Sequence, residues 1–186
     1  LKKTAASPDI LVVHYPVNPE APFDFDFSGV GVFTSIEEFQ NYTSLKTHVD
    51  SFRPDKIVVS GWANKWYLRI CREYKKNAVC ILSMDNHWTG SLKQKLFTGI
   101  FRLFLLPVFK KIWIPGIPQL EYAKKLGFKE ENIMEGFYSC DTEFCLDVGK
   151  KALELKAAAF PRRILCVARY IPSKNYEILW DAFVQW

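Results

Sequence analysis

The chain has little of what marks several large classes of protein. Its longest apolar segment, 96–109, covers about half of a bilayer span and is interrupted by Arg102, so it does not cross a membrane. No Gly-x-Gly-x-x-Gly follows a strand-like segment, which argues against a dinucleotide-dependent dehydrogenase. The net charge is only +5, and the basic residues are scattered among acidic ones, so no footprint for nucleic acid is visible.

The cysteines are not arranged for metal binding. The 186 residues contain five cysteines, an odd number, and three of them lie in apolar stretches or strands without metal-ligand spacing. Asp85, Asn86 and His87 are consecutive, and three ligand types on consecutive residues do not readily converge on one ion. We therefore predict buried free thiols in a reducing compartment, a cytoplasmic protein without a visible signal peptide, and no metal or other cofactor.

What the sequence does contain is a regular alternation of two patterns. Short apolar segments are typical of buried strands, and the segments between them have apolar residues at helical spacing. The predicted strands are 10–14, 56–59, 79–84, 111–114 and 133–135, and the predicted helices are 36–52, 64–74, 92–106 and 119–126. This repetition predicts an α/β fold, a Rossmann-like parallel sheet with helices on both faces.

The C-terminal part of the chain predicts the start of a second domain. We assign 1–145 to an N-terminal Rossmann-like domain, 146–160 to a helical linker, and 161–186 to the beginning of a second, truncated Rossmann-like domain. The chain starts at a leucine and ends inside an amphipathic helical pattern, so we interpret it as a fragment.

Polar and small residues follow three predicted strands. In an open parallel sheet, ligands bind outside the carboxyl ends of the strands, so these residues are candidates for a site. They are Ser60, Gly61 and Trp62 after the second strand, Asp85, Asn86, His87 and Trp88 after the third, and Gly116 after the fourth.

A second candidate site lies at 162–183. The apolar run 164–167 predicts a strand, and the helical pattern that follows has Ser173 as its predicted N-cap. Arg169 and Lys174 then flank one strand-to-helix turn, where two cations and the free N–H groups of a helix would hold a diphosphate. An ordinary surface turn with two solvated cations is the alternative.

These segments resemble a known family. Ala168-Arg169 and Lys174-Asn175 resemble the opening of the second domain in retaining glycosyltransferases of the GT-B fold, family 4. Upstream, Lys124 to Phe128 and Tyr138 to Phe144 resemble the close of that family's first domain. Ala168 stands where the family usually has glycine, and a methyl group there would crowd a phosphate.

The resemblance implies a hexosyltransferase. A sugar would move from a UDP-sugar or GDP-sugar to a saccharide or lipid-linked acceptor, with retention and without metal, while Arg169 and Lys174 stabilise the departing diphosphate. His87 and Asp85 would be catalytic, and the acceptor-side cleft would comprise Ser60, Gly61, Trp62, Asn86, Trp88 and Gly116. A sugar-nucleotide epimerase of the same fold and a non-catalytic sugar- or nucleotide-binding module remain alternatives.

The segment 92–111 allows two interpretations. Lys93, Lys95, Arg102, Lys110 and Lys111 surround its apolar residues, which would suit peripheral contact with an anionic inner-membrane surface and a lipid-linked acceptor there. A core helix with a basic rim is the interpretation that we favour from sequence.

Overall fold

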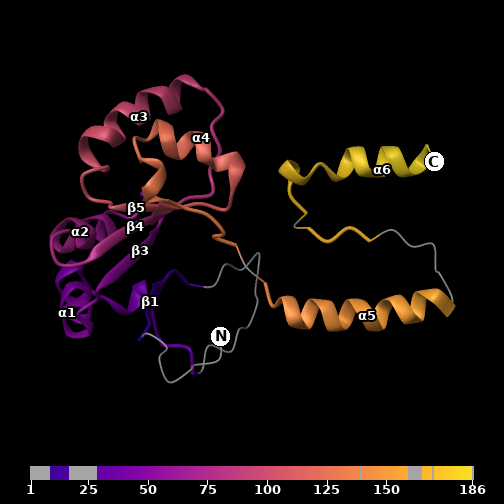
Figure 1. Ribbon diagram of the computed structural model, residues 1–186, viewed down its shortest axis with the longest axis horizontal. Coiled ribbons are helices and arrows are strands. Elements are labelled where there is room, and N and C mark those ends of the chain that lie inside the picture. The colour runs from indigo at the N-terminus through magenta and orange to yellow at the C-terminus, as the bar shows by residue number, and fades with distance from the viewer. Residues whose placement is uncertain (1–8, 17–28, 139, 159–164, 169, 186) are drawn as a thin grey trace. The chain divides into compact units, whose positions relative to one another are not determined.

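The computed structural model describes residues 9–16, 29–138, 140–158, 165–168 and 170–185, which fall into two units. Unit 1 holds 9–16 and 29–138, and unit 2 holds the described residues from 140 onward. Figure 1 labels their helices and strands.

Unit 1 alternates parallel strands with helices. Its strands are β1 (Leu11–His14), β2 (Val32–Ser35), β3 (Lys56–Ser60), β4 (Val79–Ser83), β5 (Lys111–Trp113) and β6 (Ile133–Met134). Its helices are α1 (Tyr42–Phe52), α2 (Lys65–Tyr74), α3 (Leu92–Phe104) and α4 (Ile117–Lys125), with short 3₁₀ turns at Ile36–Glu38 and Glu130–Asn132. β1 pairs with β2, and β3 to β6 form a second sheet in chain order, all parallel. The predicted Rossmann-like α/β fold is confirmed.

Polar side chains fix where the helices of unit 1 begin. The side chain of Asn41 accepts a hydrogen bond from the Ser44 N–H at the start of α1, and Asn64 accepts from the Trp66 and Tyr67 N–H groups at the start of α2. Each such cap stabilises its helix by about 1 kcal/mol. The Asn41 cap fixes the start of α1 before β3, and the Asn64 cap fixes the start of α2 after β3.

Two hydrophobic clusters hold unit 1 together. The main core comprises sixteen buried residues, among them Val59, Leu82 and Ile112 from the strands, Cys71 from α2, Phe101 from α3 and Tyr122 from α4. A smaller cluster joins Leu45 and Val49 of α1 to Ile70 of α2. Ile57 packs against both clusters, so α1 to α4 lie on the face of the strands to which Ile57 points.

A polar contact joins α1 to α2 at the rim of the smaller cluster. The Tyr74 hydroxyl donates to the Asp50 carboxylate, which also pairs with Lys46. Partial burial and this hydrogen bond raise the pKa of Tyr74 from 10.0 to about 12. The hydrogen bonds from Lys46 and Tyr74 lower the pKa of Asp50.

This contact predicts a loss of stability at alkaline pH. Because the pKa of Tyr74 is higher in the folded chain than its ordinary value, its contribution to stability is complete below pH 10 and is lost as the pH rises toward 12. Urea unfolding of the wild type and Tyr74→Phe at several pH values measures this. The difference in unfolding free energy between them should shrink over that range. A difference independent of pH would contradict the prediction.

Unit 2 contains helices but no strand in its described part. α5 (Thr142–Ala158) begins where the Asp141 carboxylate accepts a hydrogen bond from the Phe144 N–H at 2.9 Å. A 3₁₀ turn (Pro172–Lys174) then leads into α6 (Tyr176–Val184). The unit boundary after residue 139 precedes the predicted linker 146–160, and the assignment of two domains joined by a linker stays a prediction.

Two local predictions for unit 2 are wrong. Of the predicted strand 164–167, residue 164 lies outside the described residues and 165–167 do not form a strand, with Leu165 and Val167 each 85% exposed. A β-strand needs a hydrogen-bonded neighbour, and the described part of unit 2 offers none. The N-cap of α6 is Asn175 in a left-handed conformation (φ 54°), not Ser173, because the 3₁₀ turn takes up Ser173. In neither unit is a described helix long and apolar enough to span a membrane.

Candidate functional site at the carboxyl edge of the sheet

The carboxyl ends of β3 to β6 form one continuous edge. Beyond the last paired residues, the Gly61 N–H donates to the Ser83 carbonyl at 2.9 Å, and the Met84 N–H donates to the Trp113 carbonyl at 3.0 Å. Gly61 makes its turn with φ +69°, a conformation that favours glycine. The segments that follow neighbouring strands therefore start side by side.

Asp85 is the charged residue that the structure fixes most firmly at this edge. Its backbone carbonyl accepts a hydrogen bond from Gln119 Nε2 in the first turn of α4, at 3.2 Å. Its carboxylate Oδ2 accepts one from the Tyr138 hydroxyl, which follows β6, at 3.1 Å. This bond raises the pKa of Tyr138. The side chain is exposed, so the carboxylate remains accessible to a bound molecule.

His87 and Asn86 are exposed on the loop between β4 and α3. Gln94 Nε2 donates to the His87 carbonyl at 2.9 Å, and Gln94 Oε1 accepts from the Thr89 N–H at 2.7 Å, so α3 holds the loop backbone. No hydrogen bond joins the His87 imidazole to Asp85 in the described part of the chain. The imidazole is therefore available to a ligand, but Asp85 does not orient it here.

The two tryptophans predicted to line the cleft contact α3 and α4. The Trp62 ring lies 4.9 Å from the Phe97 ring and 5.8 Å from the Phe101 ring, measured between centroids. The Trp88 ring lies 5.5 Å from that of Tyr122, with the Lys125 ammonium 4.9 Å from its centroid. Both indoles are half-buried. Their predicted roles in binding remain predictions.

Ser60 and Gly116 lie at the same edge. Ser60 ends β3 and is exposed, and Gly116 directly precedes α4 in an extended conformation. No described atom lies within 4 Å of the position that a Cβ would take at Gly116. A ligand would therefore meet little steric obstruction there.

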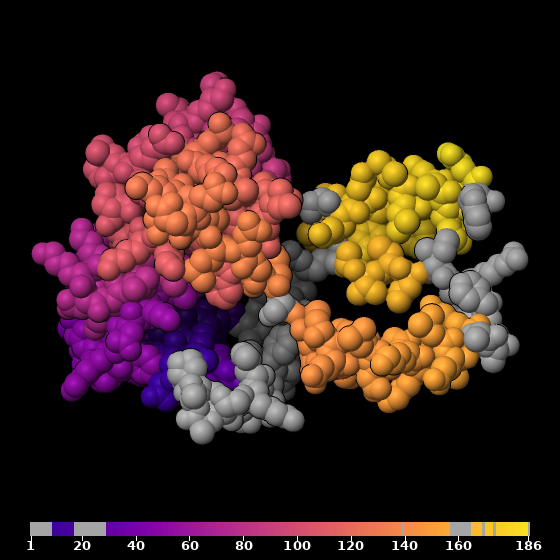
Figure 2. Space-filling view, viewed as in Figure 1, coloured from indigo at the N-terminus to yellow at the C-terminus, as the bar shows by residue number. Residues whose placement is uncertain are grey.

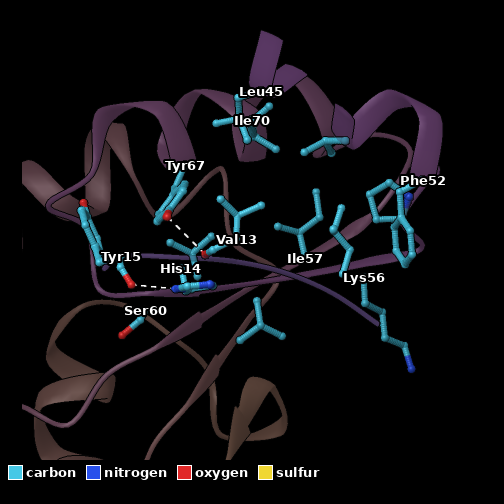
Figure 3. Close-up of a pocket in the computed structure, with 15 residues that line it drawn as sticks. Val13, His14, Tyr15, Leu45, Phe52, Lys56, Ile57, Ser60, Tyr67 and Ile70 are labelled. Carbon is cyan, nitrogen blue, oxygen red and sulfur yellow. Dashed lines mark hydrogen bonds between the residues drawn. The ribbon is translucent and has the colours of Figure 1, made fainter. Parts of the chain in front are cut away.

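A cavity adjoins this edge at Ser60 (Figure 3). It has a volume of about 430 Å³ and lies between β1 and β3, which belong to separate sheets. Figure 3 shows Val13 and Ile57 beside it on the strands and Leu45 and Ile70 above it on the helices. Such a volume suits a small molecule, and the mostly apolar lining suits an apolar group.

Tyrosines lie at the end of the cavity nearest Ser60. The Tyr67 hydroxyl donates to the Val13 carbonyl at 3.2 Å. Its pKa is raised, mainly because the hydroxyl is buried and to a smaller extent because Tyr15 lies nearby. The Tyr15 hydroxyl accepts from Asn64 Nδ2 at 2.6 Å. The sequence did not point to this cavity, because its walls come from four separate elements.

The predicted diphosphate turn is described only in part. Arg169 lies outside the described residues, so its predicted contact is not addressed. Lys174 is exposed at the end of the 3₁₀ turn, and no ion pair engages it in the described ranges. The Tyr176 hydroxyl donates to the Ala168 carbonyl at 2.8 Å, which ties α6 to the segment before the turn.

Sequence reasoning missed Tyr138 and Gln119 as site residues. Tyr138 follows β6 as Asp85 follows β4, so the rule of strand ends would have identified it if applied to the last strand. Gln119 carried no such signal, because its contact with Asp85 depends on how α4 packs.

Within the described ranges, no group of three or more His, Cys, Asp or Glu side chains is placed to hold a metal ion.

No protein-family model, curated protein or solved structure matches the chain.

Proposed function

We propose that the protein is a hexosyltransferase of the GT-B type that moves a sugar from a UDP-sugar or GDP-sugar to a saccharide or lipid-linked acceptor. The observation that carries this proposal is the placement of Asp85. It is an accessible carboxylate at the carboxyl edge of a parallel sheet, held by Tyr138 and Gln119. The resemblance of 168–175 and 124–144 to family 4 glycosyltransferases supports the choice of reaction.

In this reaction each candidate residue has a separate task. The Asp85 carboxylate accepts a hydrogen bond from the acceptor hydroxyl and takes its proton as that oxygen bonds to the anomeric carbon and the bond to the diphosphate breaks. The neighbouring His87 imidazole donates a hydrogen bond to the sugar being transferred. Arg169 and Lys174 meet the negative charge that grows on the departing diphosphate, and the anomeric configuration is retained.

The cavity suggests what kind of acceptor the protein uses, and the cysteines suggest its cellular location. The apolar cavity adjoins the edge at Ser60, so an acceptor with an apolar group next to its sugar has space beside the reacting hydroxyl. Cys71 and Cys80 are buried free thiols, as predicted, but the prediction of burial is wrong for Cys140, Cys145 and Cys166, which are exposed free thiols. Free thiols are usual in a reducing compartment, so we include a cytoplasmic location in the proposal.

Calorimetric titration of the whole protein with UDP, GDP and their sugar conjugates, with a chelator present, tests the donor site. Arg169→Ala and Lys174→Ala should each weaken binding of the preferred nucleotide about tenfold to a hundredfold, because a charge-assisted contact is lost. Lys150→Ala removes an exposed lysine of α5 and serves as the matched control, with no change expected. If no nucleotide binds, or if all three variants bind like the wild type, the proposal is wrong.

A further inference from the structure

α3 exposes an apolar stripe to solvent. Five of its large apolar side chains are between 55 and 77% exposed: Leu92, Leu96, Ile100, Leu103 and Phe104. Their spacing places them on one side of the helix. Figure 1 shows α3 at the outer edge of unit 1, beside α4, and Figure 2 gives the same view in space-filling form. We call these five residues the α3 stripe.

The opposite side of α3 supplies its contact with the main core. Phe101 is fully buried, and Phe97 is half-buried against it with ring centroids 6.0 Å apart. The core-helix interpretation favoured from sequence is therefore right for one side of α3 only. Burial of Phe101 holds the helix in place, and none of the α3 stripe belongs to the buried core cluster. Large exposed apolar patches of this kind mark interaction surfaces.

The charged residues on α3 are all positive. Residues 86–120 contain five lysines and arginines and no aspartate or glutamate. Lys93, Lys95 and Arg102 lie on α3 itself, are exposed, and form no ion pair with any described residue. Arg102 Nε donates a hydrogen bond to the Lys125 carbonyl at 2.9 Å. On the helix surface Lys93 falls beside Ile100 and Phe104, and Lys95 and Arg102 flank the other border of the stripe.

These positive charges favour one of two possible partners of the α3 stripe, a second copy of the chain or a lipid bilayer. A second copy of the chain docking on the α3 stripe through a two-fold axis would bring like charges together, which opposes association. A bilayer with anionic headgroups neutralises them instead. An apolar stripe bordered by lysine and arginine is also the arrangement of helices that lie in the plane of a membrane surface.

We propose that α3 docks unit 1 on a bilayer that carries anionic lipid. The α3 stripe enters the boundary between headgroups and acyl chains, and Lys93, Lys95 and Arg102 lie at the level of the lipid phosphates. Because α3 is only 13 residues long, it lies on the bilayer and does not cross it. The inference rests on α3 alone and is independent of the proposed transferase activity.

Flotation of the whole protein with vesicles tests this. The probes are vesicles of phosphatidylcholine alone and of phosphatidylcholine mixed with phosphatidylglycerol. We expect the protein to float with the mixed vesicles and to be released as salt is raised, because salt screens the cations from the headgroups. Lys93→Gln with Lys95→Gln should weaken binding about twenty-fivefold, because each cation contributes about fivefold.

Leu96→Ser with Ile100→Ser should weaken binding at least about tenfold, because two apolar side chains no longer enter the bilayer. Both residues are exposed, so the thermal unfolding midpoint of this variant should match that of the wild type. Val32→Ser with Val58→Ser changes two exposed apolar residues elsewhere in unit 1 and should leave vesicle binding unchanged.

Three results would overturn the proposal. In the first, the wild type does not float with the mixed vesicles. In the second, the α3 double variants float as well as the wild type. In the third, the protein forms a concentration-dependent dimer without lipid that Leu96→Ser with Ile100→Ser abolishes, which would assign the α3 stripe to a second copy.

Discussion

Phe101→Ala is expected to lower the free energy of unfolding by about 3 to 5 kcal/mol, because it removes a fully buried ring and leaves a cavity. The Phe101 ring contacts Trp62 and Phe97, and it lies 5.9 Å from Phe128 between centroids. It therefore joins α3 to segments that follow β3 and α4. Domains are commonly stable by about 5 to 15 kcal/mol, so this loss would be a large fraction of the total. Urea unfolding followed by tryptophan fluorescence measures it.

Phe104→Ala is the matched control for this measurement. Phe104 lies on the same helix, one turn closer to its end, and is 60% exposed. Truncation of an exposed side chain usually changes stability by no more than about 0.5 kcal/mol. Equal losses for Phe101→Ala and Phe104→Ala would contradict the assignment of Phe101 to the core and of Phe104 to the surface.

The strands and helices of unit 1 were predictable because each carries a local signal. Ile57 and Val59 alternate with exposed neighbours in β3, and the helical segments repeat apolar residues at 3.6-residue spacing. β2 was missed because Val32–Ser35 is short and half polar, so its pattern is that of a loop. The segment 165–168 has a strand-like sequence, but the described part of unit 2 supplies no neighbouring strand.

The candidate site was predictable in position but not in detail. The rule that ligands bind at the carboxyl ends of parallel strands correctly placed Asp85, Gly116 and Ser60 at one edge. It could not give side-chain directions, since these depend on the packing of α3 and α4. Trp62 and Trp88 therefore contact those helices, which no pattern in the sequence indicated.

The exposure of the α3 stripe was equally beyond the sequence. The spacing of apolar residues along a helix does not by itself show which side of the helix faces the core. Two sets of apolar residues occur on α3, and only the contacts of Phe101 decide which of them is buried. The sequence did indicate the surrounding cations, and for that reason it left the membrane contact open.

Asp85→Asn is expected to lower kcat about a hundredfold to ten-thousandfold if the proposed transfer takes place at this edge, with a much smaller change in KM. The substitution keeps the shape of the side chain and an oxygen that can accept from Tyr138. It removes the negative charge that would hold the acceptor hydroxyl. Steady-state transfer assays of the whole protein with the nucleotide sugar that binds in calorimetry measure the change.

A second readout shows whether Asp85→Asn acts locally. The hydrogen bond to the Asp85 carboxylate raises the pKa of Tyr138, so the variant should lower that pKa toward its ordinary value of 10.0. Tyrosinate absorbance is followed against pH for Asp85→Asn and for the double variant Asp85→Asn with Tyr138→Phe. The difference between the two curves gives the titration of Tyr138 alone. Tyr138→Phe alone keeps the carboxylate and should lower kcat only about tenfold. If the Tyr138 pKa falls as expected while kcat is unchanged, the contact exists but Asp85 takes no part in transfer, and the proposed chemistry at this edge is wrong.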